Sequence, residues 1–145
     1  MKQQLPSSDA HIRPEGVTDE AIEGLGKLSE GLEKIERARG ALYEFHQLIG
    51  GADITISESA DILEQAGFSE QAETIRTKVV GRNLLAGRWS FQIVEEFDDG
   101  YYRDVKDVEK NVRDTLVEGK RHIYESEMKE ANRTRGLPGH EARPE

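Results

Sequence analysis

The chain has 145 residues, the usual size of one domain. Lys and Arg number 20 against 29 Asp and Glu, and the net charge of -9 argues against a protein that binds nucleic acid or an anionic membrane through a basic surface. The absence of cysteine excludes disulfides, thiolate metal sites and a cysteine nucleophile. No run approaches the roughly 20 apolar residues of a membrane helix, and the polar start is not a secretory signal, so we expect a soluble, cytoplasmic protein.

The prolines divide the chain into three regions. All four lie near the ends, at Pro6, Pro14, Pro138 and Pro144, and the long middle stretch without proline permits long helices. We therefore expect a flexible N-terminal arm over residues 1–17, a single helical domain over 18–134 and a disordered C-terminal tail over 135–145.

Residues 18–49 predict one long amphipathic helix. Thr18 is a good N-cap, and Asp19 lies in the first turn, where the helix dipole favours an acid. The pair Gly50 and Gly51 is expected to end the helix. Apolar residues follow one another at steps of three and four, at Ala21, Leu25, Leu28, Leu32, Ile35, Ala38, Leu42, Phe45 and Ile49.

Four glycines lie inside this predicted helix, and each costs up to about 1 kcal/mol relative to alanine. They indicate close approach of another helix, local bending, or simple tolerance in a packed helix. These glycines are Gly24, Gly26, Gly31 and Gly40.

Three further helices are predicted. Asp53 or Thr55 can cap a short helix that stops near Gly67, and Ser69 can cap another. A last helix extends from Trp89 to about Thr134. We expect a possible bend in it at Gly100 and a weak point near Gly119–Lys120, where the apolar stripe has no large member.

These elements predict an all-α antiparallel helical bundle with two long and two short helices. At about 1.5 Å per residue, the first long helix would measure roughly 48 Å and the segment Tyr101–Thr134 of the last one roughly 51 Å. A compact chain of this length is only about 38 Å across. We therefore expect a homodimer, with coiled-coil packing, to cover the helix ends. A break at Gly40, Gly100 or Gly119 would weaken that argument.

Residues 81–102 form the densest chemical region, with the only Trp and five of the nine aromatic residues. If a small molecule binds, we expect it here, between polar side chains and aromatic walls. The expected ligand-binding residues are Arg82, Asn83, Arg88, Trp89, Gln92 and Tyr102. We also expect Trp89 to be largely buried where the third and last helices meet.

Four carboxylates within five residues make the same region a candidate Mg²⁺ site. Their mutual repulsion would be relieved by a hard cation. Two structural alternatives remain open: a solvated acidic face, or arginines of the segment that pair with its acids. The candidate metal ligands are Glu95, Glu96, Asp98 and Asp99.

A second acidic pattern suggests an alternative function. All-helical nucleotide pyrophosphohydrolases hold Mg²⁺ with Glu-x-x-Glu on one helix and Glu-x-x-Asp on the next. Here Glu30 and Glu33 precede Glu58 and Asp61. Acids are so common in this chain that about six such pairs arise by chance, so the pattern has low specificity.

The run Gly87–Tyr102, with Val80–Asn83 before it, resembles a family of small bacterial all-helical proteins described only as uncharacterised. The similarity extends from about Glu23 to His140. The resemblance implies no activity, because none is attached to the family.

We therefore expect a non-enzymatic cytoplasmic helical protein that binds a protein partner or itself and needs no cofactor. The competing hypothesis is a Mg²⁺-dependent hydrolase of nucleotides.

Overall fold

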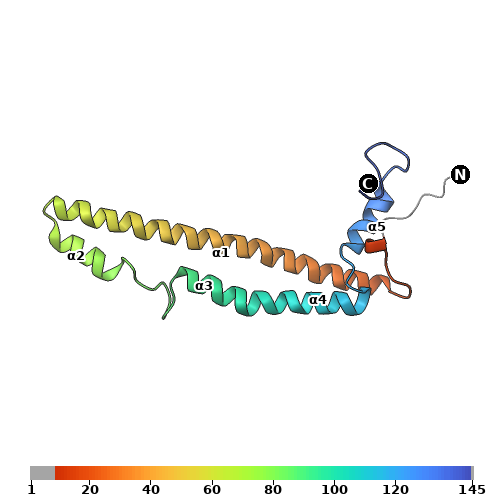
Figure 1. Cartoon of the computed structure of the whole chain (residues 1–145), viewed down its shortest axis with the longest axis horizontal. Coiled ribbons are helices and arrows are strands. Elements are labelled where there is room, and N and C mark those ends of the chain that lie inside the picture. Colours follow the sequence, from red (N-terminus) through yellow and green to blue (C-terminus); the bar gives the residue numbers. More distant parts are fainter. Residues whose placement is uncertain (1–8, 145) are drawn as a thin grey trace. The chain divides into compact units, whose positions relative to one another are not determined.

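The computed structural model describes residues 9–144 (Figure 1). Within this range the only β-type pairing is an isolated bridge between Leu85 and Arg88, so the predicted all-α class is confirmed. The helical elements are η1 (Asp9–His11), α1 (Asp19–Gln65), α2 (Ser69–Lys78), α3 (Ser90–Phe97), the π-helical segment η2 (Asp98–Tyr102), α4 (Arg103–Val117) and α5 (Ile123–Asn132).

Helix α1 begins where its cap residue predicted. The hydroxyl of Thr18 accepts a hydrogen bond from the backbone N–H of Ala21 at 3.2 Å, which satisfies one of the unpaired amides of the first turn. Asp19 in that turn also forms an ion pair with Arg13, at 2.6 Å.

The prediction that Gly50 and Gly51 end the first helix was wrong. Helix α1 passes through both glycines and ends at Gln65, so that it is 47 residues long. It therefore includes the residues of the second predicted helix. A glycine ends a helix by adopting the left-handed conformation, and neither Gly50 nor Gly51 has a positive φ. Asp53, which we had considered as a cap, instead accepts a hydrogen bond from the Gly81 N–H at 2.9 Å.

The real end of α1 lies at Gly67, as expected. Gly67 has φ +92°, and the N–H of Phe68 reaches back to the carbonyl of Leu63 at 2.8 Å, the bond that defines a Schellman motif. Helix α2 then starts at Ser69. Its N-cap position is Phe68 and makes no side-chain cap, so Ser69 is the first helical residue and not the cap.

The predicted last helix is not continuous. Residues 98–102 are π-helical around Gly100, and the chain leaves helical geometry between Val117 and Ile123. Glu118, Gly119 and His122 all have positive φ in this break. The expected weak point at Gly119–Lys120 is thus confirmed. The length argument for a dimer now rests on α1 alone, which is about 70 Å long.

Contacts group the chain into two units. The terminal unit comprises Met1–Lys34 and Asp104–Glu145, and the central unit comprises Ile35–Arg103, so that α1 contributes to both. The core of the terminal unit is small, with Val112 and Val17 packed around it. Its buried members are Ile22, Leu25, Val117 and Ile123.

The segment expected to be a flexible arm has defined contacts from residue 11 onward; residues 1–8 lie outside the described range. The ring Nδ1 of His11 lies 2.7 Å from the Arg121 carbonyl, and the Lys120 ammonium donates to the Ile12 carbonyl at 3.0 Å. Arg13 binds both carboxylate oxygens of Glu127, at 3.0 and 2.9 Å. These contacts attach the segment to α5 and to the loop before it.

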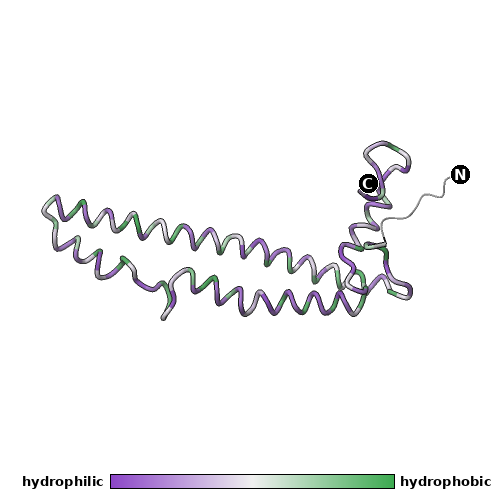
Figure 2. Tube along the Cα trace, in the orientation of Figure 1, coloured by the Kyte–Doolittle hydropathy of each residue, from purple (hydrophilic) through white to green (hydrophobic). Residues whose placement is uncertain are grey.

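In the central unit the buried side chains come from three helices. Ala60 of α1 and Ala72 of α2 are fully buried, and Val94 and Ser90 of α3 are nearly so. Figure 2 shows apolar and polar positions interleaved along α1.

The glycines inside α1 are not points of close helix approach in the described chain. A Cβ built on Gly24, Gly26, Gly31 or Gly40 meets nothing within 4 Å. Of the helices in residues 9–144, none combines the length and apolar character that a membrane span requires.

Candidate functional site

The predicted site segment, residues 82–102, lies entirely in the central unit. Arg82 and Asn83 are exposed in the loop after α2. The loop then closes into a tight turn, in which the N–H of Leu84 donates to the Arg88 carbonyl at 3.0 Å. Gly87 supplies the positive φ of +69° that this turn requires.

Trp89 and Gln92 form the start of α3. The Trp89 N–H donates to Oε1 of Gln92 at 2.8 Å, so the Gln92 side chain caps an amide at the helix N-terminus. The Trp89 side chain is half-buried. This partial burial is in the direction that we expected for Trp89, which lies at the N-terminus of α3.

Arg88 pairs with Glu96, one of the predicted metal ligands. The guanidinium contacts both carboxylate oxygens, with Nη2 to Oε1 at 3.0 Å, and its hydrogen bonds hold the pKa of Glu96 below its usual range. The pair therefore matches the structural alternative stated above, in which an arginine of the segment pairs with one of its acids.

Asp98, a second predicted metal ligand, pairs with an arginine from another helix. Arg39 of α1 donates from Nε to Oδ1 at 2.8 Å and from Nη2 to Oδ2 at 3.1 Å. The same guanidinium stacks 4.6 Å from the Tyr102 ring and 5.1 Å from the Tyr43 ring. The Arg39 hydrogen bonds lower the pKa of the Asp98 carboxyl.

Tyr102, a predicted ligand-binding residue, is also held by α1. Its hydroxyl donates to the Glu36 carboxylate, at 2.7 and 2.8 Å from the two oxygens, and its ring stacks on Phe97 at 6.0 Å. We call Glu36, Arg39, Tyr43, Asp98 and Tyr102 the aromatic clasp. The π-helical turn places both Asp98 and Tyr102 toward α1, and such turns are common at functional sites.

The four acids of the segment do not converge on one point. Glu96 faces Arg88 and Asp98 faces Arg39, whereas Glu95 and Asp99 are exposed. Among residues 9–144 no group of three or more His, Asp and Glu side chains is placed to hold a metal ion. The donors therefore do not fit the predicted Mg²⁺ site.

The acidic pattern of the nucleotide pyrophosphohydrolases is not reproduced either. Glu30, Glu33, Glu58 and Asp61 all lie on α1, and not on two consecutive helices that could face one ion. Glu30 lies within 4 Å of two lysines, and Asp61 pairs with Arg76 at 2.8 Å.

Sequence analysis missed a contact between His46 and Ser90. The His46 Nδ1 lies 2.7 Å from the Ser90 hydroxyl oxygen, across α1 and α3. Ser90 is 1% exposed, so its hydroxyl is inaccessible to a substrate and the pair joins the two helices. The sequence separation of 44 positions leaves no pattern that could reveal the pair in advance.

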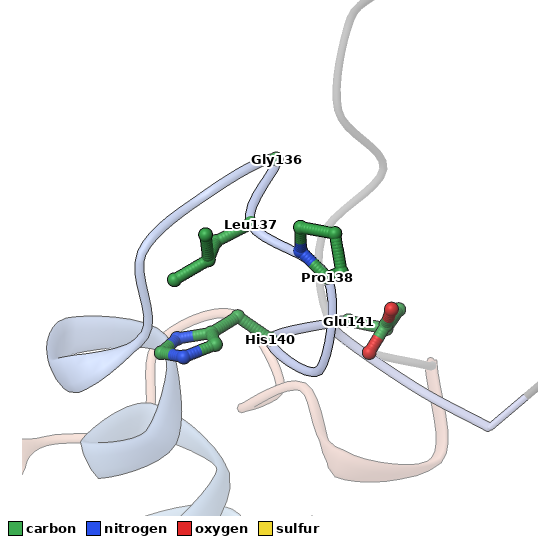
Figure 3. A pocket seen from close by; sticks show the side chains of 5 residues that line it. All are labelled: Gly136, Leu137, Pro138, His140 and Glu141. Carbon is green, nitrogen blue, oxygen red and sulfur yellow. The ribbon is translucent and has the colours of Figure 1, made fainter.

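A pocket of about 240 Å³ lies in the C-terminal loop, outside the predicted segment (Figure 3). The Thr134 N–H donates to the His140 ring at 3.0 Å, and Arg133 donates to the His140 carbonyl at 3.1 Å. These two contacts connect the end of α5 to His140, within the range 135–145 where we expect a disordered tail. The pocket is lined by Gly136, Leu137, Pro138, His140 and Glu141.

Comparison with protein-family models, with curated proteins and with solved structures finds no match for this chain.

Proposed function

We propose that this protein is a cytoplasmic helical interaction module that associates with a second copy of itself. The observation that carries the proposal is the exposure of large apolar side chains on α1. Leu48 and Ile62 are each 65% exposed, although both lie in well-formed helix. Apolar helix faces of this kind mark protein interaction sites.

Covering these apolar side chains contributes free energy to association. Full burial of one Leu or Ile side chain contributes about 1.5–3 kcal/mol, so covering the exposed two-thirds of Leu48 contributes about 1–2 kcal/mol. Several such residues on each copy are needed, because association itself costs several kcal/mol in lost freedom of motion.

The chemistry of the predicted site segment supports a structural role for it. Its arginine–carboxylate pairs, Arg88–Glu96 and Arg39–Asp98, are used inside the central unit. These pairs stabilise the helices that carry the exposed apolar side chains. Because the charged groups of the segment are used in this way, we assign binding to the apolar surface of α1.

Light scattering tests the proposal. The dimer has twice the 16.3 kDa mass of the chain, and we expect that mass at micromolar concentration. A monomer mass that persists at about 100 μM would contradict self-association. Thermal melting with Mg²⁺ and a nucleoside triphosphate tests the competing hydrolase hypothesis, because ligand at 100 times its Kd adds about 2.7 kcal/mol to the free energy of unfolding.

A further inference from the structure

Helix α1 carries a second apolar face in the central unit. Six exposed positions follow one another at alternating steps of three and four, the spacing of a coiled-coil seam. None of them is charged. We call these residues the exposed seam: Ala38, Ala41, Phe45, Leu48, Ala52 and Thr55.

The neighbouring face of the same helix is already covered. Leu42, Ile49 and Ile56 are half-buried and Ala60 is fully buried. On this side His46 contacts Ser90 of α3. At 100° per residue the two faces lie side by side, so α1 has an apolar surface wider than a single packed neighbour requires.

We propose that the exposed seam pairs antiparallel with the exposed seam of a second copy, about a two-fold axis between residues 46 and 47. The inference rests on the proposed self-association and specifies its surface and register. In this register Phe45 packs against Leu48 of the partner subunit. Ala41 then lies opposite Ala52 of the partner subunit, and Ala38 opposite Thr55 of the partner subunit.

Charge selects this register. Along one edge of the seam the flanking residues are Arg37, Glu44, Gly51 and Glu58, seven residues apart. Antiparallel pairing sets this edge against the same edge of the partner. Arg37 then faces Glu58 of the partner subunit, twice per dimer, and Glu44 faces only a glycine.

The neighbouring registers are disfavoured. A shift of seven residues in one direction sets Glu44 against Glu58 of the partner subunit, and a shift in the other sets Glu44 against its own copy. Both juxtapose like charges. Arg37 and Glu58 are exposed and have no ion pair among the described residues, so both side chains remain available.

The orientation follows from what covers the other edge. In a parallel pair the charged edge would meet the partner's Leu42–Ile49 edge, on the side where His46 contacts Ser90 of α3. In the antiparallel pair the covered faces of both copies lie on the same side of the two α1 helices. The result is a bundle-like layer of four helical segments.

Charge exchange provides the sharpest test. Arg37→Glu and Glu58→Arg should each weaken the dimer by about tenfold, because each places like charges together twice. The double variant should return the dimer Kd to within about twofold of wild type. Sedimentation equilibrium measures the three constants. A double variant as weak as either single variant would overturn the register.

A matched pair of apolar variants tests the surface itself. Leu48→Glu lies on the seam and Ile54→Glu lies off it on the same helix, and the two side chains are equally exposed in the chain. Leu48→Glu should give a monomer and Ile54→Glu a dimer, both with wild-type helical circular dichroism. If Ile54→Glu alone dissociates the dimer, self-association stands and the seam is overturned. A monomeric wild type would overturn both.

Discussion

The guanidinium of Arg39 binds both carboxylate oxygens of Asp98, 59 residues away in the chain, and joins α1 to the π-helical turn η2. Both side chains are less than a third exposed, so solvent screens the pair only partly. Tyr102 and Tyr43 lie over the guanidinium and complete the aromatic clasp. The clasp therefore fixes how α1 and η2 meet in the central unit.

This pair predicts a specific dependence of stability on pH. Its hydrogen bonds lower the pKa of Asp98 in the folded state, so its contribution is fully present above the unfolded pKa of about 4 and is lost as pH falls through the lower folded value. Asp98→Asn should reduce the Tm at pH 7 by a few degrees, and the difference from wild type should shrink in acid. Asp99→Asn, at the exposed neighbour, is the control. A difference that stays constant down to pH 2 would refute the assignment.

The core of the terminal unit predicts a large effect at Ile22. This side chain is 3% exposed and packs with Val117, which is fully buried. Ile22→Ala should lower the free energy of unfolding by about 2–5 kcal/mol, through lost burial and the cavity left behind. Urea denaturation measures the change. Ile54→Ala, at a position that is 63% exposed, should change the free energy of unfolding of the monomer by less than about 0.5 kcal/mol.

In the break between α4 and α5 we expect two substitutions to change the stability of the protein in opposite directions. His122 adopts φ +56°, which costs a side chain about 1–2 kcal/mol, so His122→Gly should stabilise the protein by up to about 1 kcal/mol. Gly119 has φ +75°, and an added Cβ would lie 2.8 Å from the Asp114 carboxylate. Gly119→Ala should therefore destabilise the protein. Thermal melts of the two variants, compared with wild type, show whether the signs differ.

Trp89, the only Trp of the chain, provides a direct optical reporter. Because its side chain is half-buried, its emission maximum should lie between those of a buried and a fully hydrated indole, and acrylamide should quench it partially. Gln92→Ala removes the hydrogen bond to the Trp89 N–H and should destabilise α3 by about 1 kcal/mol, with a shift of emission toward the hydrated value. Emission that is fully hydrated already in the native wild type would contradict the structure.

Local signals in the sequence were sufficient for much of the secondary structure. The Thr18 cap and the helix end at Gly67 were both predicted, and so was the break near Gly119. Each depends on backbone geometry within a few residues. Gly50 and Gly51 were misjudged because a glycine costs a helix only about 1 kcal/mol, and packing of the flanking turns of α1 offsets that cost.

The candidate site shows where local reasoning stops. Composition alone indicated that residues 82–102 are rich in acids and aromatic side chains, but it left both a metal site and a structural network open. Asp98 meets Arg39, and Ser90 meets His46, only because α3 and η2 pack on α1.

The sequence by itself therefore determined that this chain forms amphipathic helices with defined starts and ends, because caps, glycines and apolar spacing act over one or two turns. Only the tertiary structure decided which carboxylates are neutralised and which apolar face of α1 stays exposed at Leu48. The physical reason is that a side chain's charge partner and its burial depend on residues that are distant in sequence. Because the hydrophobic effect is not directional, a periodic apolar pattern does not specify which surface will cover it.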